Sequence, residues 1–531
     1  MGRKHVLLAG LMLLTASAGM AQPSMMSSGI NNPGPSAPGE WTIYPGSYNS
    51  QRHSPLKQVT PANVHLLQVK WVYHVANARE LEATPVVHDG IMYIAQYNRV
   101  DAIDARTGNV IWRYQRPPAS TAAYRGTSVY DNKVFVATTD AHLVALDARS
   151  GDVVWDVPVE GGRRLSGIPP MAIKGKLIVG VLDQPDGYIQ AYDTATGKYL
   201  WTWHDIPKLG EPESKSWSDG QKEGGGAIWM SGSFDPEQNA IIYGTGQPNP
   251  PYSNEVREGD NLYSDTIAAI DIDTGKLKWH FQTTPHDQHD WDATSGSQVL
   301  VDTVYEGKPR KLLMHADRNG FFYLLDRTNG KFLRGNSFID DMNWASGLSP
   351  EGRPILVGDG AKPSLKGTLT CPSTAGATNW PSATYSPETG WLYFHAIEGC
   401  GVNYRSSSTP GAGTSYIESP DDKTHWVSHI RAMDPLTGKR MWDLTEVRSN
   451  HYGPGLLSTA GGLLFAPGQL GEAEMLDAKT GKRLWHLNTG DFITASPITY
   501  MIDGKQYFTV ISGTNVFAFG LPEAAAAGGK P

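Results

Sequence analysis

A short motif that recurs along the 531-residue chain restricts its fold more than any other feature. Each copy has an Asp, a Gly four positions later and a Trp eight positions after the Asp. The six complete copies are DARTGNVIW, DARSGDVVW, DTATGKYLW, DIDTGKLKW, DPLTGKRMW and DAKTGKRLW, which begin at Asp104, Asp147, Asp193, Asp271, Asp434 and Asp477. A seventh copy, DRTNGKFLR from Asp326, has lost the Trp.

The motif predicts a hairpin that must stack on copies of itself. Apolar residues before the Asp, as in HLVAL from His142, predict a strand, and Asp with Gly builds a tight turn. The returning strand ends in an indole that packs between neighbouring sheets. Because one hairpin cannot bury its own apolar face, the copies must stack.

The spacing of the copies favours a propeller over a solenoid. Asp104 and Asp147 lie 43 residues apart, as do Asp434 and Asp477, which fits one four-stranded blade each. An eighth unit is predicted around Trp71, and the strands from Tyr507 to Phe519 are expected to pair with it and close the ring. We therefore predict an all-β, eight-bladed β-propeller with tryptophan-docking repeats.

The ends of the chain indicate export. Arg3 and Lys4 precede the apolar run from Val6 to Leu14, which is shorter than the ~20 residues that cross a bilayer. We predict a signal peptide at 1–21 (rather than a membrane anchor), a flexible leader at 22–40, the propeller at 41–522 and a disordered tail at 523–531. The expected location is the periplasm, with no membrane span after signal removal. The formal net charge of -8 argues against nucleic acid as a partner.

Three strings in the regions that interrupt the repeat carry a resemblance to a known family. They are GDNLY from Gly259, TPHDQHD from Thr284 and DRNGFFYLLDR from Asp317. In this order on a propeller repeat, they resemble the PQQ-dependent methanol and ethanol dehydrogenases. The resemblance implies an enzyme that oxidises alcohols by hydride transfer to pyrroloquinoline quinone, assisted by a metal ion. Because no C-x-x-C-H haem motif occurs, the implied electron acceptor is external, such as a cytochrome c.

The resemblance also implies the catalytic and cofactor-binding residues. The last Asp of TPHDQHD, Asp290, matches the catalytic base, and Arg318 matches the cation beside the reactive quinone oxygen. The cofactor contacts are assigned to Glu82, Arg125, Trp229, Asn379 and Arg318. Trp229 matches the indole that lies flat against the quinone; its alternative is one more indole between blades. For Asn379 the alternative is a turn residue.

The implied metal ligands follow the family pattern less closely. The assigned set is Asp183, Gln247, Asn249, Asp290 and Asp292. Gln247 and Asn249 are alternatives for one amide ligand, and Asp183 is preferred to Asp186 in a loop that lacks the family's Glu. Asp292 resembles the extra carboxylate of lanthanide-dependent members, since a trivalent cation favours more anionic oxygen ligands. The metal is therefore predicted to be Ca²⁺ or a lanthanide, and the alternative for Asp292 is a surface carboxylate.

The two cysteines, Cys371 and Cys400, match a bridge seen in the family, so a disulfide is predicted. It would stabilise the fold by roughly 3 kcal/mol through the loop it closes. Two other functions remain open at this point. The repeat also resembles non-enzymatic scaffold propellers of the cell envelope, and a quinoprotein of the same fold can act on aldehydes or polyols instead of simple alcohols.

Overall fold

The computed structural model describes residue 37 and residues 39–523, except 79–80, 119–123, 163–166, 184–185, 218–223, 407–412, 417–425 and 447–453. The predicted signal peptide, most of the leader and most of the tail lie outside the described residues. Within them the regular structure is 38 strands and four short 3₁₀ helices: η1 (Val64–Leu66), η2 (Pro212–Ser216), η3 (Asn254–Val256) and η4 (Ala293–Ser295). The chain is therefore all-β, as predicted. No helix in the described part is both long and apolar enough to cross a bilayer.

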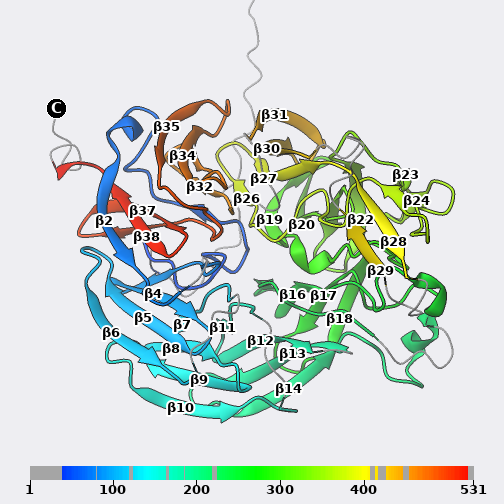
Figure 1. Cartoon of the computed structure of the whole chain (residues 1–531), viewed down its shortest axis with the longest axis horizontal. Helices are drawn as coiled ribbons and strands as arrows, with labels where there is room; N and C mark the ends of the chain where they lie inside the picture. Colours follow the sequence, from blue (N-terminus) through cyan, green and yellow to red (C-terminus); the bar gives the residue numbers. More distant parts are fainter. Residues whose placement is uncertain are drawn as a thin grey trace, which may run out of the picture.

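Successive antiparallel sheets are arranged around a common centre (Figure 1). The first two are β3–β6 (Val86–His88, Ile91–Gln96, Arg99–Asp104, Val110–Gln115) and β7–β10 (Val129–Tyr130, Lys133–Ala137, His142–Asp147, Val153–Pro158). The next three are β11–β14 (Met171–Ile173, Lys176–Asp183, Asp186–Asp193, Tyr199–His204), β15–β18 (Ser233–Asp235, Ala240–Gly244, Thr266–Asp271, Leu277–Gln282) and β19–β22 (Val299–Tyr305, Lys308–Ala316, Phe321–Asp326, Lys331–Ser337).

Three further sheets complete the arrangement. They are β26, β27, β30 and β31 (Thr384–Ser386, Trp391–Glu398, Val427–Asp434, Lys439–Thr445); β32–β35 (Leu457–Thr459, Leu463–Phe465, Glu472–Asp477, Arg483–Asn488) with β1 (His53–Ser54); and β36–β38 (Ile498–Ile502, Lys505–Ser512, Asn515–Gly520) with β2 (Gln68–His74). Two small sheets were not predicted: β23–β24 (Ala345–Leu348, Pro354–Leu356), and β25, β28 and β29 (Thr368–Thr370, Gly401–Arg405, Gly413–Tyr416).

The indoles of the repeat dock on the next sheet, as the sequence predicted. Five indoles donate their N–H to the backbone carbonyl of the residue that follows the next repeat Asp, whereas the buried Trp279 indole N–H has no hydrogen-bond partner among the described residues. The pairs are Trp71 to Ala105, Trp112 to Ala148, Trp155 to Thr194, Trp201 to Ile272 and Trp442 to Ala478, at 3.0–3.1 Å. The repeat Gly is required for two reasons, its positive φ and the close approach of an indole. Gly108 has φ +77°, and a Cβ there would lie 2.9 Å from the Trp71 ring.

The copy without Trp keeps the contact by other means. Arg334 occupies the Trp position, and its Nη1 donates to the carbonyl of Leu436, in the next repeat, at 3.0 Å. A guanidinium thus replaces an indole as the donor between sheets.

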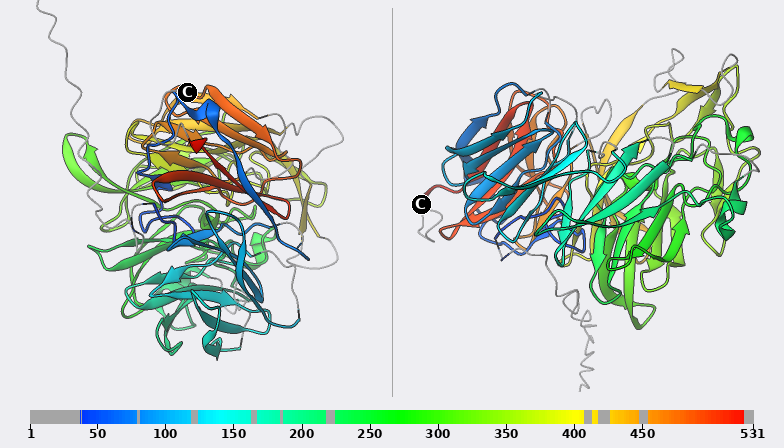
Figure 2. Two further views of the ribbon diagram at one scale, coloured as in Figure 1. Left: turned by 90° about the vertical axis from the view of Figure 1, so that its left-hand side faces the viewer. Right: turned by 90° about the horizontal axis from the view of Figure 1, so that it is seen from below.

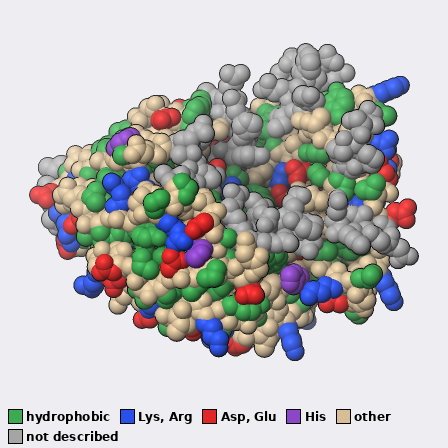
Figure 3. All heavy atoms as spheres, turned by 60° about the horizontal axis from the view of Figure 1, so that its bottom comes forward, with side chains coloured by type: hydrophobic (Ala, Val, Ile, Leu, Met, Phe, Trp, Pro, Cys, Tyr) green, Lys and Arg blue, Asp and Glu red, His purple; other side chains and the backbone are tan. Residues whose placement is uncertain are grey.

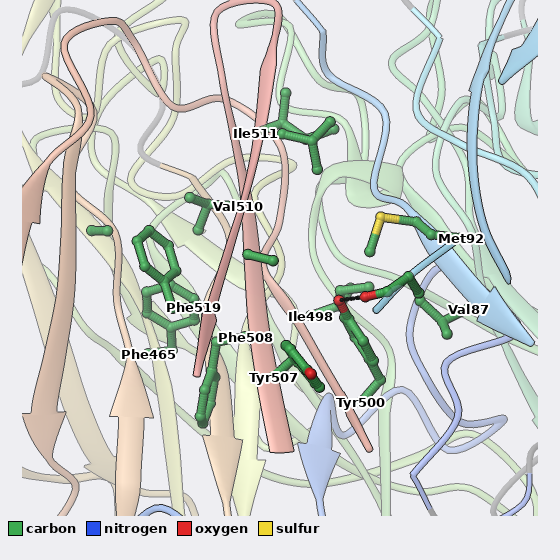
Figure 4. Close-up of a cluster of buried hydrophobic side chains, with 14 of the residues drawn as sticks. Val87, Met92, Phe465, Ile498, Tyr500, Tyr507, Phe508, Val510, Ile511 and Phe519 are labelled. Carbon is green, nitrogen blue, oxygen red and sulfur yellow. Dashed lines mark hydrogen bonds between the residues drawn. The ribbon is translucent and has the colours of Figure 1, made fainter. Parts of the chain in front are cut away.

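The two ends of the chain share one sheet, as predicted. β2 pairs antiparallel with β38, and the Trp485 indole N–H donates to the carbonyl of Leu67 just before β2 at 3.2 Å. Figure 2 shows the blue N-terminal strand beside the red C-terminal strands. Apolar side chains from both ends pack in this region; Figure 4 shows Val87 and Met92 near Ile498 and Tyr500. Burial of each large apolar side chain contributes about 1.5–3 kcal/mol.

Candidate active site

The TPHDQHD string forms the loop between β18 and β19, and it presents Asp290. The backbone of Asp290 has φ +68°, a left-handed conformation that side-chain-bearing residues rarely adopt. Its carboxylate Oδ2 lies 3.9 Å from Nη2 of Arg318, and 29% of its side chain is exposed. Asp290 is therefore a partly exposed carboxylate with a cation next to it.

Arg318, in the turn between β20 and β21, joins the two predicted carboxylates. Its Nη1 donates to Oδ2 of Asp292, and its Nη2 donates to the backbone carbonyl of Thr374. The other Asp292 oxygen, Oδ1, accepts the backbone N–H of Gln247 at 2.8 Å. The guanidinium is thus fixed by two other segments of the chain, and only 7% of its side chain is exposed.

Burial controls the protonation of both carboxylates. It raises the pKa of Asp290 to about 8, against the opposing effect of the Arg318 cation. Burial also raises the pKa of Asp292, again opposed by Arg318. An acid whose pKa lies near the working pH is suited to exchange protons with a substrate.

A second group of predicted residues surrounds Arg125. Its Nη2 lies 3.1 Å from Oε2 of Glu82. Its guanidinium carbon lies 5.0 Å from the ring centre of Trp229 and 4.9 Å from that of Trp380. The Nε of Arg125 is buried and has no hydrogen-bond partner among the described residues. Two flat indole faces and a cation with a spare donor therefore lie together.

Asn379 lies beside this group and bonds within its own segment. Its Nδ2 donates to the carbonyl of Ala375 at 2.7 Å, and its Oδ1 accepts the N–H of Trp380 at 2.8 Å. The side chain is buried. In this structure Asn379 therefore fixes the turn that carries Trp380, which is the alternative role considered from the sequence.

Backbone contacts connect the two groups. Gly226, three residues before Trp229, donates its N–H to the carbonyl of Gln247 at 2.9 Å. Ala377, two residues before Asn379, donates to the carbonyl of Arg318 at 2.8 Å. The predicted residues whose side chains are described thus belong to one continuous region. Figure 3 shows the surface hollowed near the middle of one face, with acidic and basic side chains inside the hollow.

The predicted metal ligands are only partly described. Asp290, Asp292 and Gln247 lie together as given above, whereas the side chains of Asp183 and Asp186 lie outside the described residues. The N–H of Asn249 donates to the carbonyl of Gly224 at 3.0 Å. Among the described side chains, no group of three or more His, Cys, Asp or Glu is gathered as a metal would require. The metal ligand set therefore stays a prediction.

Two contributors were missed by the sequence reasoning. Trp380 lies outside the repeat and follows Asn379 directly; the TNWP string was the available signal. Thr374 contacts Arg318 through a backbone oxygen, which no side-chain pattern reveals. The predicted bridge between Cys371 and Cys400 is present and ties down the segment that holds Thr374, Asn379 and Trp380.

Comparison with known proteins gives a consistent result. Residues 41–335 match the family model "Glucose/ethanol/alcohol dehydrogenase, beta-propeller domain", and residues 409–527 match "Outer membrane protein assembly factor BamB". The chain is 37% identical to quinoprotein alcohol dehydrogenase PedH of Pseudomonas putida, over 87% of this chain and 84% of that protein. It is 34% identical to 1-butanol dehydrogenase (cytochrome c) of Thauera butanivorans, over 90% of this chain and 75% of that protein.

Solved structures agree with the sequence comparisons. The quinohemoprotein alcohol dehydrogenase of Comamonas testosteroni superposes with a TM-score of 0.84 at 34% identity, covering 93% of this chain and 81% of that one. A europium-containing methanol dehydrogenase superposes with a TM-score of 0.82 at 29% identity, covering 91% of this chain and 98% of that one.

Proposed function

The chain belongs to the PQQ-dependent quinoprotein alcohol dehydrogenases, and from this premise we propose that it oxidises alcohols to aldehydes or ketones with its own bound PQQ and metal ion. The observation that carries the proposal is the contact of Arg318 with both Asp290 and Asp292, beside the Arg125 group. A scaffold propeller has no need for a partly exposed carboxylate with a raised pKa next to a buried cation.

The residues around Arg125 fit a flat, anionic cofactor. PQQ is planar and carries carboxylates, so it requires an aromatic face and cationic donors. Trp229 supplies the face, and the buried Nε of Arg125 is a donor that still lacks a hydrogen-bond partner among the described residues. Glu82 would hold Arg125 in place, and Asn379 would act through Trp380.

The chemistry divides between the cofactor and the chain. When bound, PQQ would supply the hydride acceptor and the metal ion would supply Lewis-acid polarisation. Ionised Asp290 would take the hydroxyl proton of the alcohol, because its carboxylate is partly exposed. Arg318 matches the family's cation beside the reactive quinone oxygen, and it would stabilise negative charge that develops there. The alcohol would thus give its hydroxyl proton to Asp290 and its hydride to bound PQQ.

The donor set fits a hard cation. Carboxylate and amide oxygens of Asp290, Asp292 and Gln247 or Asn249 would hold it, with Asp183 as the further candidate. Two carboxylates two residues apart favour a trivalent ion, and the europium-containing relative is consistent with a lanthanide. Ca²⁺ is the alternative.

The wider setting is proposed on the same basis. The seven four-stranded sheets and the five-stranded sheet would be eight blades of one catalytic domain at 41–522. The protein would act in the periplasm after removal of residues 1–21, between leader 22–40 and tail 523–531. Its electrons would pass to an external acceptor such as a cytochrome c, since one relative's name includes that acceptor.

Reconstitution tests the proposal. The full chain is loaded with PQQ and either Ca²⁺ or La³⁺, and dye reduction is followed with alcohols, aldehydes and polyols. We expect PQQ absorbance to stay with the protein through gel filtration, and alcohols to reduce the dye. A protein that retains no PQQ and reduces no dye with any substrate is a scaffold instead. Turnover confined to aldehydes or polyols would show that these compounds, rather than simple alcohols, are the substrates.

A further inference from the structure

Asp290 is one of two aspartates in the TPHDQHD string, and the other has a different environment. Asp287 is buried, with 1% of its surface exposed, and takes no part in the chemistry proposed above. Its carboxylate accepts three successive backbone N–H groups. Oδ1 accepts from His289 at 2.9 Å, and Oδ2 accepts from Asp290 at 2.9 Å and from Trp291 at 3.0 Å.

This arrangement is a clamp on the backbone of Asp290. Three N–H groups that point to one carboxylate define the course of the chain from 287 to 291. Within that course Asp290 takes φ +68°, an unfavourable conformation for a residue with a side chain, which needs support from its surroundings. Bonds to a charged acceptor are strong enough to provide that support.

The clamp residue is itself fixed by Arg257, which precedes the GDNLY string. Arg257 is fully buried, and its Nη2 donates to the backbone carbonyl of Asp287. Its Nε donates to the carbonyl of Pro250 at 3.0 Å, and its Nη1 donates to Oδ1 of Asn261 at 2.8 Å. One guanidinium thus joins the Asp287 loop to the segment that follows Asn249.

The flanking residues are anchored away from the reaction space. The Trp291 indole N–H donates to the carbonyl of Ser373 at 2.9 Å, and His289 Nε2 pairs with the carbonyl of Gly360 at 2.8 Å. Both side chains are buried, as is Gln288. Between 287 and 291, only Asp290 has a partly exposed side chain.

We propose that Asp287, fixed by Arg257, is the positioning residue that holds Asp290 in its left-handed conformation and directs the Asp290 carboxylate toward Arg318. The inference rests on the proposed function, because it concerns the proposed base of that reaction. It assigns a role to the GDNLY region, which the catalytic chemistry leaves without one.

The test is Asp287→Asn in the full chain loaded with PQQ and metal. The amide keeps the shape of the carboxylate but replaces one accepting oxygen with an NH₂ donor. That donor cannot accept the backbone N–H groups that the carboxylate oxygen accepted. We expect kcat to fall about tenfold to hundredfold, with KM for the alcohol within about threefold, because a small displacement of a catalytic group has effects of this size. The matched control is Asp477→Asn, which removes a similar amide clamp in an outer turn (Lys479 N–H at 3.1 Å and Thr480 N–H at 2.9 Å). It should leave kcat unchanged.

Hydrogen exchange gives a readout that does not require turnover. In a peptide covering 284–295, we expect the backbone amides of 289–291 to exchange at least tenfold faster in Asp287→Asn and to be unchanged in Asp477→Asn. Unchanged exchange, or faster exchange with an unchanged kcat, overturns the proposal. If Asp287→Asn does not fold, Arg257→Lys is measured, and the same exchange change with a loss of about threefold to tenfold in kcat is expected. A wild type without any turnover rejects the proposed function, while the exchange data still test the clamp.

Discussion

The carboxylate of Asp290 and the guanidinium of Arg318 are close but do not form a tight pair: Oδ2 lies 3.9 Å from Nη2. The strong bonds of Arg318 go to Asp292 and to the Thr374 carbonyl. Asp290 is therefore close enough to Arg318 to be influenced by its charge, but it does not form a close ion pair with it. The chemistry of the site depends on that separation.

Asp290→Asn should abolish alcohol oxidation and leave PQQ bound. The amide cannot accept the hydroxyl proton, whereas the cofactor contacts around Arg125 are made by other segments. We expect kcat to fall at least 10²-fold, a typical contribution of a general base. Steady-state dye reduction and PQQ absorbance after gel filtration provide the measurement. A variant with substantial turnover would show that another group takes the proton.

The pH dependence of turnover should follow Asp290. Burial raises its pKa to about 8, and only the ionised form can accept a proton. A bound metal cation would lower this pKa from about 8, so we expect kcat/KM of the loaded enzyme to rise with pH and to level off at or below about pH 8. Because the Arg318 cation opposes the rise in this pKa, Arg318→Gln should move the midpoint to higher pH. A pH profile that shows no rise anywhere between pH 4 and 9 would contradict the assignment.

Asp292→Ala should change the response to metal more than it changes the fold. Asp292 accepts from Arg318 and from the Gln247 N–H, so its loss removes one anionic oxygen donor where a trivalent ion would need it. Apo-protein refilled with La³⁺ should lose at least tenfold in kcat, and protein refilled with Ca²⁺ should lose less. Equal activation of the variant and the wild type by La³⁺ would reject the lanthanide hypothesis.

Removal of the disulfide should destabilise the protein without removing the site. The bridge closes a separation of 29 residues that contains Thr374 and Asn379. In the chain-entropy model, Cys371→Ser with Cys400→Ser lowers the free energy of unfolding by about 3 kcal/mol. Chemical denaturation of the oxidised wild type, the reduced wild type and the double variant measures this loss. Equal midpoints for all three would show that the bridge adds nothing.

Local repetition could be predicted from the sequence, and long-range backbone geometry could not. The spacing from Asp104 to Trp112 fixed both the turn and the docking of the indole, because each depends on a few adjacent residues. In the sequence, Asp287 cannot be distinguished from any other loop carboxylate. Its role depends on the directions of backbone N–H groups, which the fold determines. Trp380 contacts Arg125 only because segments 255 residues apart meet; no local pattern encodes that meeting.

The small sheets illustrate the same limit. Strands β23 and β24 have three or four residues each and lie in an insertion without the repeat. Most of their residues are partly or fully exposed, so the strands lack the alternation of buried and exposed residues that would reveal them in a sequence. The proposed catalytic residues could be predicted from the family resemblance, whereas the residues that hold them in place could be identified only from the three-dimensional fold.

The buried pair of His395 and Glu446 should make stability depend on pH. His395 Nδ1 lies 3.1 Å from Glu446 Oε2, and its Nε2 lies 2.6 Å from the carbonyl of Pro454. Since both partners accept, the ring must carry two protons. Burial lowers the pKa of His395, but Glu446 outweighs this and leaves it raised. Burial raises the pKa of Glu446, but His395 outweighs this and, with smaller effects from Ser428 and His429, leaves it lowered.

The sign of the effect follows from these two shifts. A raised histidine pKa gives stability that is complete below about pH 6.5 and is lost as the pH rises through the folded value. A lowered glutamate pKa gives stability that is present above about pH 4.5 and is lost as the pH falls through the folded value. His395→Gln should therefore cost most between about pH 4.5 and 6.5, on the order of 2 kcal/mol, and clearly less at pH 9. Thermal melts of both proteins from pH 4 to 9 measure the difference, and a difference that does not vary with pH would mean that the ring is neutral.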